Sequence, residues 1–520
     1  MINTNELSEN IPDYKEYDIA IIGAGPAGIM AAISAASSCR TDSISICLLE
    51  RNESAAKKLL LTGNGRCNYT ADIDIDGMLS AFGKKGRFFS EAFKEFSNND
   101  LIDFFKAEGI EPEYEKSGNS ETLIKVFPKN KNASSVRQCL IEKLLKNNID
   151  IFYGFRAKKV LKIKNFYEKD GNHLFEVSPY CSCRFDNRLN HNIKNNLELD
   201  NRGTGYSSYS NPAADISGSV KHSINNYKLN RDPFSVFARK IILATGGRTY
   251  PKTGSTGDGY EIAKNLGHSI NELSPYLVSI FSKDRDITLL SGISIKEAGL
   301  KILAGKKVIA TNTGSILFTH SGLSGPCAVG IGHEVYKLIN NKNKNDIAAH
   351  SSIPFNEHKP NLDFFEASID LAPDLSFEDF RKEISRVYNS NPKKELLTIL
   401  NMIFKNIPER LLDLILIRCK IIKNLKIGNL SKAEMAVIYS LIKNLEFKID
   451  NRLYFDEAIV TEGGIPVKEI NPKDLQSIIT NGLYFAGEII ELAGPEGGFN
   501  LQKAFSTGWL AGKSAAKSLN

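Results

Sequence analysis

The chain has 520 residues, of which 42% are hydrophobic and 24% are charged, and this composition excludes a disordered chain and a membrane-embedded one. The net charge of +6 is close to balance for this length, so it predicts neither a nucleic-acid partner nor a membrane partner. Eight scattered cysteines and a polar N-terminus unlike a signal peptide argue against disulfides and against a metal site, and they predict a cytoplasmic protein.

The first fifty residues predict a βαβ unit. Residues 17–22 and 45–50 are short apolar runs that indicate buried strands, and residues 27–38 between them have helical content. A GxGxxG sequence joins the first strand to the helix, and an acidic residue ends the second strand, a combination typical of a dinucleotide site. The glycines let the backbone approach a pyrophosphate, the helix N-terminus offsets its charge, and the acidic residue accepts hydrogen bonds from ribose. The predicted cofactor ligands are Gly23, Gly25, Pro26, Ala27, Gly28, Glu50 and Arg51.

Further elements follow along the chain. Residues 91–108 and 134–147 have the apolar spacing of amphipathic helices, and residues 158–177 alternate like a strand pair. Residues 178–233 are rich in Asn, Ser and Gly and poor in apolar residues, so we expect a disordered insertion there. Residues 237–247 then predict a strand that runs into a glycine turn.

The second half of the chain divides into three parts. Short strand signals over residues 274–375 predict a β-rich domain, and apolar residues at helical spacing predict a helical subdomain over residues 376–455. Residues 456–520 return to the first domain, which therefore comprises residues 14–273 and 456–520. The predicted class is α/β, with a Rossmann-like domain that is interrupted by insertions.

FAD and NAD share the glycine motif, and the rest of the chain favours FAD. Two more strands end in glycine far from the first, one of them before a carboxylate, and a glycine pair opens the last helix. These separated strand ends suit FAD because it is long and is contacted along its whole length. Free N–H groups of the last helix could stabilise negative charge at the flavin N1 and O2 atoms, where Gly498 would let the backbone approach the ring. The residues assigned to this site are Thr245, Gly246, Gly247, Gly487, Glu488, Gly498, Phe499, Asn500 and Leu501.

A glycine-rich loop supplies further cofactor candidates. Gly65 allows the backbone to curl, Arg66 could pair with a phosphate or a substrate carboxylate, and Asn68 could hydrogen-bond the cofactor. Lys58, just before the loop, is either a cofactor contact or a solvated charge. Cys67 is a cofactor contact or covalent attachment point, a redox partner, or a small side chain that only fills space.

Three residues are candidates for catalysis. His320 could donate a proton because histidine titrates near neutral pH, and the alternative is a hydrogen-bonded histidine in a glycine-rich turn. Tyr250 directly follows the second glycine turn and could line the flavin cleft. Cys67 is the third candidate, as a redox-active thiol.

The chain resembles a known family in five stretches. They are GAGPAG (23–28), KKLLLTGNGRCNYT (57–70), ATGGRTYPKTGSTGDGYEIAKNLGH (244–268), FTHSGLSGP (318–326) and GLYFAGEIIELAGPEGGFNLQKAFSTGWLAGKSAA (482–516). They are similar to the YhiN/BaiN-like flavoproteins, also called aminoacetone-oxidase-family FAD-binding enzymes. The resemblance runs in order over nearly the whole chain. It implies FAD, a fold of the two-dinucleotide-binding-domain type, an inserted β-barrel-like domain and a small helical subdomain.

The expected function is that of an FAD-dependent oxidoreductase that passes a hydride between non-covalently held flavin and a small or medium organic substrate. The resemblance admits a reductase of an activated double bond or an oxidase of an amine. NADH or NADPH could serve as a transient electron donor, since the sequence has no second GxGxxG. The alternative is a flavin-binding protein with structural FAD and a regulatory or nucleic-acid-related role. These residues predict neither the substrate nor the oligomeric state.

Overall fold

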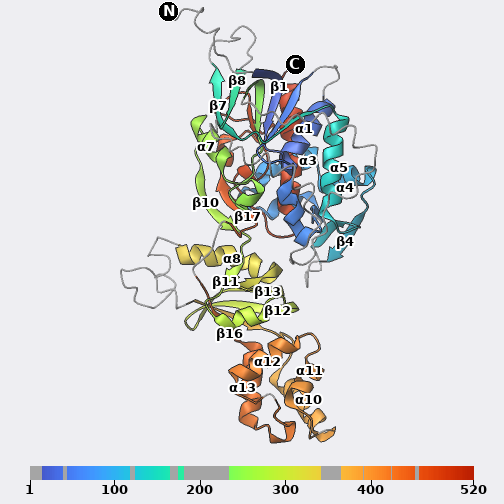
Figure 1. Cartoon of the computed structure of the whole chain (residues 1–520), viewed down its shortest axis with the longest axis vertical. Coiled ribbons are helices and arrows are strands. Elements are labelled where there is room, and N and C mark those ends of the chain that lie inside the picture. Colours follow the sequence, from blue (N-terminus) through green and yellow to red (C-terminus); the bar gives the residue numbers. More distant parts are fainter. Residues whose placement is uncertain are drawn as a thin grey trace, which may run out of the picture.

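The computed structural model describes residues 14–38, 44–116, 123–163, 174–180, 234–340, 365–390, 392–422, 424–450 and 456–519. Almost all of the insertion predicted at 178–233 lies outside the described residues. Figure 1 shows three parts along the long axis, namely a large α/β lobe, a β-rich part and a group of helices at the far end. None of the described helices is long and apolar enough to cross a membrane.

A seven-stranded sheet forms the centre of the large lobe, with the strand order β6-β2-β1-β9-β8-β7 and β18 paired to β9. Its strands are β1 (Tyr14–Ile22), β2 (Ile46–Glu50), β6 (Asp150–Tyr153), β7 (Ala157–Ile163), β8 (Leu174–Pro179), β9 (Ser235–Leu243) and β18 (Leu483–Phe485). The strands β6, β2, β1, β9 and β18 are parallel neighbours, while β7 and β8 are an antiparallel pair at one edge. The parallel sheet confirms the predicted Rossmann-like fold class.

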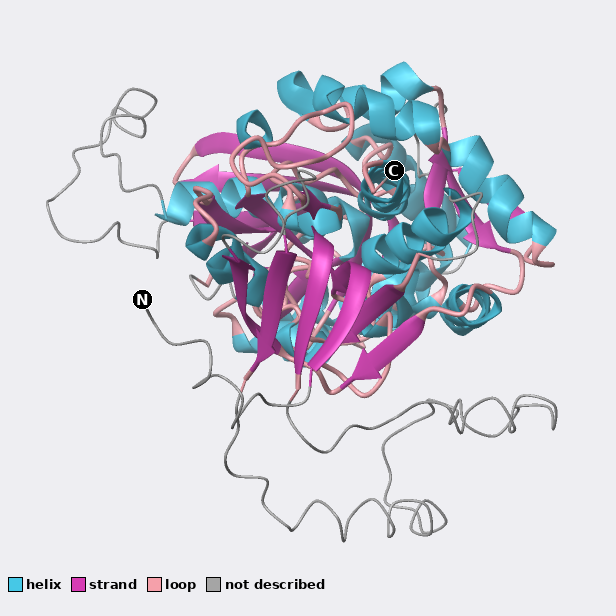
Figure 2. Ribbon diagram, turned by 90° about the horizontal axis from the view of Figure 1, so that it is seen from above, coloured by secondary structure: helices cyan, strands magenta, loops and turns pink. Residues whose placement is uncertain are grey.

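Helices cover this sheet, as Figure 2 shows from above. They include α1 (Pro26–Ser38), α5 (Ala133–Lys146), α7 (Asp258–Asn265) and α14 (Phe499–Lys517). Every residue of β2 is buried, because helices and loops cover both faces of the parallel sheet. The βαβ unit β1-α1-β2 therefore forms as the sequence predicts, and α14 begins directly after the glycine pair at 497–498.

One predicted helix, over residues 91–108, is two helices in the structure. Helix α3 (Ser90–Glu95) ends before Ser97, whose side chain accepts a hydrogen bond from the Asp100 N–H and starts α4 (Asn98–Ala107) with a capping box. The apolar spacing continues through this break, which is why it was not predicted. Beside these helices lie α2 (Ile75–Ser80) and a small sheet of β3 (Thr70–Asp72), β5 (Ile124–Pro128) and β4 (Pro112–Lys116).

The β-rich part is a six-stranded antiparallel sheet with the order β11-β14-β13-β12-β15-β16. Its elements are β11 (Ile280–Phe281), β12 (Ser294–Ala304), β13 (Lys307–Phe318), β14 (Gly322–Ser324), α8 (Gly325–Asn340), β15 (Phe365–Asp370) and β16 (Leu445–Lys448). Its ends meet, because the Lys283 N–H donates to the Lys448 carbonyl (3.0 Å) and the Asp450 N–H donates to the Phe281 carbonyl (2.8 Å). The sheet is therefore barrel-like. Two strands, β10 (Asn271–Tyr276) and β17 (Val460–Gly464), pair at the junction with the large lobe.

Four helices follow β15 and occupy the far end of the molecule (Figure 1). They are α10 (Phe377–Ser390), α11 (Leu396–Ile403), α12 (Glu409–Arg418) and α13 (Lys432–Lys443). Residues 445–448, inside the range predicted to be helical, instead form β16 of the barrel-like sheet. One hydrophobic core includes residues of both the sheet and the helices, so these two parts pack as one body. A separate core fills the large lobe.

Candidate active site

A cavity of about 1820 Å³ runs from the glycine turn after β1 to the barrel-like sheet. Its walls come from the ends of β1, β2 and β9, the 3-10 segment η1 (Lys57–Gly65), the loop before α14, and strands β12 and β13. These wall segments are far apart in the sequence. The cavity therefore lies where the carboxyl ends of the parallel strands meet the inserted domain.

Most of the predicted site residues line this cavity. They are Gly23, Gly25, Pro26, Ala27, Glu50, Arg51, Lys58, Arg66, Asn68, Thr245, Gly246, Tyr250, Glu488, Gly498, Asn500 and Leu501. The predicted residues that do not line it are Gly28, Gly65, Cys67, Gly247, Gly487, Phe499 and His320. His320 lies on an exposed turn between β13 and β14, so the structure does not bring it to the site.

The glycine turn after β1 has one glycine that faces the cavity and one that permits packing. A Cβ on Gly25 would meet no protein atom within 4 Å, so this backbone is open to a ligand. A Cβ on Gly28 would lie 1.9 Å from the Gly23 carbonyl oxygen, so only glycine lets α1 start this close to the strand. The open backbone at the N-terminus of α1 fits a pyrophosphate.

Glu50 lies at the end of β2, buried at the cavity wall. Its carboxylate accepts hydrogen bonds from the Ala24 N–H (2.9 Å) and from the N–H (2.8 Å) and side-chain amide (2.7 Å) of Asn52. Burial raises the pKa of Glu50, and these three hydrogen bonds oppose the rise. Glu50 thus ties its strand end to the glycine turn, and Asn52, which sequence reasoning missed, orients the carboxylate.

Arg51 pairs with a carboxylate that the sequence did not suggest. Its guanidinium lies 3.2 Å from Asp258 at the start of α7, and Arg156 donates to the same carboxylate at 2.7 Å. Burial raises the pKa of Asp258, but the hydrogen bonds from Arg156 and Thr256 outweigh it and hold this pKa below its ordinary value. All three charged residues line the cavity near Glu50, where they form one wall.

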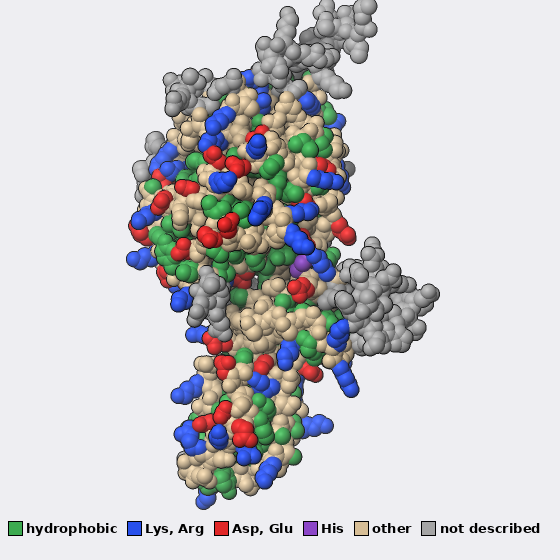
Figure 3. All heavy atoms as spheres, turned by 180° about the vertical axis from the view of Figure 1, so that it is seen from behind, with side chains coloured by type: hydrophobic (Ala, Val, Ile, Leu, Met, Phe, Trp, Pro, Cys, Tyr) green, Lys and Arg blue, Asp and Glu red, His purple; other side chains and the backbone are tan. Residues whose placement is uncertain are grey.

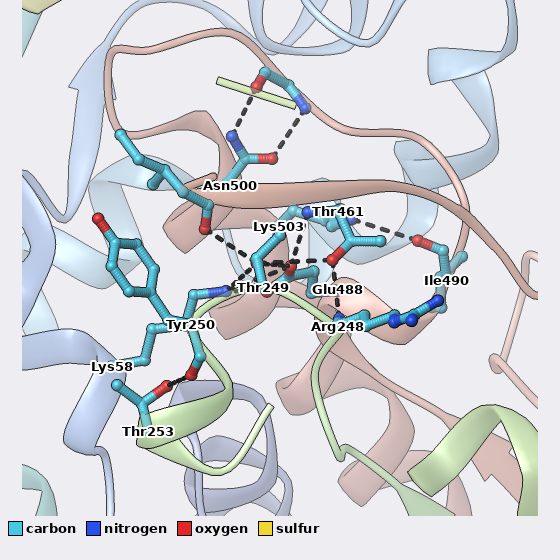
Figure 4. Close-up of polar contacts among 12 residues, drawn as sticks. Lys58, Arg248, Thr249, Tyr250, Thr253, Thr461, Glu488, Ile490, Asn500 and Lys503 are labelled. Carbon is cyan, nitrogen blue, oxygen red and sulfur yellow. Dashed lines mark hydrogen bonds and ion pairs between the residues drawn. The ribbon is translucent and has the colours of Figure 1, made fainter. Parts of the chain in front are cut away.

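Glu488 is the centre of a polar network deeper in the cavity (Figure 4). Its carboxylate accepts from Lys58 Nζ (2.9 Å), the Thr461 N–H (2.8 Å) and the Thr249 hydroxyl (3.2 Å). Burial raises the pKa of Glu488, but Lys58 and these hydrogen bonds outweigh it, so the pKa lies below its ordinary value. Lys58 thus contacts Glu488, a residue that we predicted to bind the cofactor. Gly247 packs directly against the same carboxylate.

The start of α14 differs in one respect from the prediction. A Cβ on Gly498 (φ +94°) would lie 2.4 Å from the Thr70 carbonyl carbon, so the backbone of β3 is what requires glycine there. The Asn68 amide, oriented to satisfy its neighbours, accepts from the Gly498 N–H (3.1 Å) and donates to the Thr70 carbonyl (2.8 Å). Asn500 bonds the N–H (2.8 Å) and carbonyl (2.6 Å) of Gly494. Both amides therefore shape the loop before α14.

In the loop after η1, the charged side chain is paired and the thiol is buried. Arg66 pairs with Glu115 (3.0 Å) and lies over the Phe127 ring, 4.4 Å from its centroid. Cys67 is 0% exposed and adopts φ +61°, and burial raises the pKa of its thiol to about 12. It is therefore protonated at neutral pH and lies outside the cavity lining, which argues against the predicted catalytic role.

Tyr250 has an unusual backbone beside the cavity. It adopts φ +53°, and its carbonyl accepts from the N–H (2.8 Å) and hydroxyl (2.7 Å) of Thr253. Burial raises the pKa of its phenol, with a smaller contribution from the Glu457 carboxylate, so the hydroxyl stays protonated at neutral pH. In Figure 4 its ring points away from the Lys58–Glu488 pair. Strain of this kind is found at functional sites.

The donors and acceptors of the cavity fit FAD. The Thr245 hydroxyl is buried at the cavity wall and has no hydrogen-bond partner among the described residues. The open Gly25 backbone suits the pyrophosphate, Glu50 suits the adenosine ribose and Glu488 suits the ribityl hydroxyls. The N-terminus of α14 suits the flavin ring, because the first turn of a helix leaves N–H groups without acceptors. Each part of the cofactor thus has a complementary group.

Comparisons with known proteins show what this chain is similar to. The model of the HI0933-like protein Rossmann domain matches residues 17–178 and 210–514. The 3-dehydro-bile acid delta(4,6)-reductase of Clostridium scindens is 27% identical over 502 residues, which cover 96% of this chain and 99% of that protein. The ribosomal RNA dihydrouridine synthase of Haemophilus influenzae is 26% identical over 516 residues, covering 99% and 100%. A solved 3-ketosteroid-delta4-(5alpha)-dehydrogenase from Rhodococcus jostii RHA1 is 14% identical, with a TM-score of 0.45 and 98% of each chain covered.

Proposed function

The chain belongs to the HI0933-like Rossmann-domain family, and from this premise we propose that it reduces a carbon–carbon double bond conjugated with a carbonyl group. Family membership confirms the predicted resemblance and the enzyme class, an FAD-dependent oxidoreductase. One relative is named for reducing delta(4,6) double bonds of a 3-dehydro bile acid, and the other for making dihydrouridine, in which a ring double bond beside a carbonyl is saturated. The two named reactions share one chemistry on different substrates.

The cavity carries this proposal. Small-molecule sites usually enclose about 300–1000 Å³, whereas this cavity has about 1820 Å³ and extends beyond the FAD-binding residues to the barrel-like sheet. The inserted domain contributes polar side chains there, including Ser294, Asn312 and Ser324. This second region has room and hydrogen-bonding groups for an organic substrate with a carbonyl oxygen.

Tyr250 is our candidate for the proton donor. FAD, when bound and reduced, supplies the hydride, which goes to the β-carbon of the substrate, and a proton must then reach the α-carbon. The Tyr250 hydroxyl is protonated at neutral pH, lines the cavity and has no hydrogen-bond partner among the described residues. It can therefore donate without first breaking a bond within the protein.

The electron donor in this proposal is NADH or NADPH, bound transiently. The sequence has a single GxGxxG, which FAD would use, so the protein would have no dedicated second dinucleotide domain. The nicotinamide would then enter the same open part of the cavity that later receives the substrate.

Anaerobic stopped-flow experiments test the proposed function. We expect NADH or NADPH to bleach the flavin and an α,β-unsaturated ketone, but not its saturated analogue, to restore the yellow colour. The Tyr250→Phe variant should keep its FAD and its rate of reduction by nicotinamide, while reoxidation by the ketone slows by about 10²-fold or more. Rapid reoxidation by oxygen alone, with no response to any conjugated acceptor, would contradict the reductase and favour an oxidase.

A second candidate substrate is a uridine in RNA, and the charge distribution favours it. Residues 376–443 contain 13 Lys and Arg but 7 Asp and Glu, so the four-helix part alone has the net +6 of the whole chain. On the face that Figure 3 shows, blue side chains lie along the outline of this end of the molecule, with red ones between them. Among the described residues, several exposed ones have no carboxylate partner: Arg381, Lys393, Lys405, Lys420 and Lys432. Pro373 and Asp374, just before α10, line the cavity, so the basic helices begin at its edge.

Salt-dependent binding separates the two substrates. If RNA is the substrate, a uridine-containing fragment binds with an affinity that falls steeply with salt. Reversing the charges of Lys393, Lys405 and Lys420 to Glu should then weaken binding at least tenfold and leave turnover of a small ketone unchanged. If the wild type and the charge-reversal variant bound RNA equally weakly, the small organic substrate would be favoured. The prediction that no nucleic acid binds would then stand.

A further inference from the structure

Helix α14 carries a buried lysine beneath the cavity, and sequence reasoning did not predict it. Lys503 is 1% exposed and lines the cavity one turn after the helix begins. Its Nζ donates to the carbonyls of Leu492 (2.8 Å) and Ile490 (3.4 Å), and it lies 5.7 Å from the centroid of the Phe89 ring. Burying an ammonium group is costly, so such a residue needs a reason.

No carboxylate among the described residues neutralises this lysine directly. Glu488 is the carboxylate that acts on the charge of Lys503, and it already accepts hydrogen bonds from Lys58 and from the Thr461 N–H. Figure 4 shows the three charged side chains close together, beside Tyr250. Two cations and one carboxylate leave the floor of the cavity with one positive charge in excess.

The excess charge lies at the flavin end of the site. The pyrophosphate would lie over Gly25 at the start of α1, and the cavity runs from there past Glu488 to the start of α14. Because Lys503 is one turn into α14, a flavin ring bound at the start of this helix would lie near both the lysine and the helix N-terminus. Helix dipole and ammonium would act in the same direction on any negative charge that forms above them.

We propose that Lys503 is the electrostatic residue that raises the reduction potential of the bound flavin, by stabilising the negative charge that the ring gains when it accepts a hydride. The hydride brings two electrons and one proton to the oxidised ring, and the ring keeps one negative charge. At neutral pH Lys503 keeps its own proton in both states of the flavin and faces this charge. The inference rests on FAD binding and does not depend on which substrate or donor the enzyme uses.

The ionisation of Lys503 makes the effect dependent on pH. Burial lowers the pKa of Lys503 to about 8, with Lys58 on η1 lowering it and Glu488 raising it, and the uncharged Phe89 ring completes its surroundings. Negative charge on the reduced ring would raise the pKa of Lys503 above its value in the oxidised protein. At a pH between these two values, reduction of the flavin would be accompanied by protonation of Lys503. The reduction potential would therefore fall more steeply with pH in this range.

A structural role is the competing explanation. The carbonyls that Lys503 binds belong to the loop before α14, where Leu492 adopts φ +82°. Replacing the lysine could loosen this loop without changing the electrostatics at the ring. The test must therefore measure a property that loop stability alone does not change.

Reduction potentials of the holoprotein provide that measurement. Compared with the wild type, Lys503→Met should have an equilibrium constant for flavin reduction that is at least tenfold smaller. For two electrons this corresponds to a reduction potential lower by about 30 mV. The affinity of the flavin for sulfite should fall by a similar factor. Lys503→Arg keeps the positive charge, so its reduction potential and its affinity for sulfite should stay close to those of the wild type. Dithionite serves as reductant, so these measurements remain valid even if no nicotinamide or ketone reacts and the proposed function fails.

The wild-type protein alone provides a second test. Its potential should fall about 30 mV per pH unit more steeply above pH 8 than below it, the slope that one extra proton adds for two electrons. In Lys503→Met this break should be absent. A constant slope in the wild type would overturn the proposal. So would an unchanged potential in Lys503→Met together with a lower melting temperature, because Lys503 would then only stabilise the loop before α14.

Discussion

Adding one methyl group at Gly25 should affect ligand binding, whereas adding one at Gly28 should affect the stability of the fold. At Gly25 the new Cβ of Gly25→Ala would meet no protein atom within 4 Å and would project into the cavity. At Gly28 the new Cβ of Gly28→Ala would lie 1.9 Å from the Gly23 carbonyl oxygen. The first change therefore acts on the ligand, and the second acts on the fold.

The magnitudes follow from these surroundings. Gly25 does not have a positive φ, so alanine is tolerated, and the apoprotein should change in stability by less than about 1 kcal/mol. A methyl group between the backbone and a pyrophosphate breaks at least one charged hydrogen bond, worth about 1.5–3 kcal/mol, so FAD should bind about 10- to 100-fold more weakly. For Gly28→Ala the backbone must move by more than an ordinary packing adjustment, which costs at least about 3 kcal/mol.

The assay compares flavin-free forms of the wild type and both variants. Calorimetric titration with FAD gives the affinity, and thermal unfolding without FAD gives the stability. Gly25→Ala should show weak binding with a normal melting temperature, and Gly28→Ala should show a clearly lowered melting temperature. If Gly25→Ala bound FAD as tightly as the wild type, the pyrophosphate would not lie over this turn and the assignment of the site would be wrong.

Three further substitutions test individual interactions. Lys58→Met should lower the free energy of unfolding by about 2 kcal/mol at pH 7; since the pair lowers the pKa of Glu488, this loss should shrink as the pH falls below about 4, and a pH-independent loss in urea titrations would refute the pairing. Cys67→Ala should retain FAD and turnover, because the thiol is buried and protonated; loss of turnover with FAD still bound would restore its redox role. Asp258→Asn should cost about 1–2 kcal/mol in thermal unfolding because it leaves Arg51 and Arg156 without their shared partner; an unchanged melting temperature would show that the cluster is not stabilising.

Local patterns were enough to predict the part of the site that follows the chain directly. The turn from β1 to α1 and the acidic end of β2 lie within about thirty residues, and their geometry is set by strand, glycine turn and helix alone. Gly25 and Glu50 could therefore be assigned from the sequence. Asn52, two residues after Glu50, could have been suspected, because an amide that close can reach back to the carboxylate.

Residues that depend on tertiary packing could not be assigned in this way. Lys503 stands in a helix between polar and apolar neighbours and resembles a solvated lysine, but η2 (Gly83–Phe89) and the loop before α14 cover it. His320 and Tyr250 each lie in a short glycine-rich segment, and no local pattern tells which way such a turn faces. Only the pairing of β13 with β14 places His320 on the exposed side.

Gly498 shows that a correct residue can be predicted for a reason that the structure changes. The glycine was expected to admit the flavin ring, and it does border the cavity. Its missing Cβ, however, leaves space for the backbone of Thr70 in β3, which is 428 residues away in the sequence. A larger side chain would therefore push the small β3-β5-β4 sheet away from α14 whether or not FAD is bound, so FAD loss in such a variant would not by itself locate the ring.

Net charge shows the same limit on a larger scale. A value of +6 over the chain suggested no electrostatic partner, yet outside residues 376–443 the positive and negative side chains cancel completely. The average concealed a basic four-helix part because the neutral remainder of the chain is much longer. Electrostatic attraction is screened over roughly 10 Å, so an incoming polyanion would respond to the charge of the helices near it and not to the balance of the whole chain. Charge is therefore more informative when it is counted for each part of the molecule than when it is counted for the whole chain.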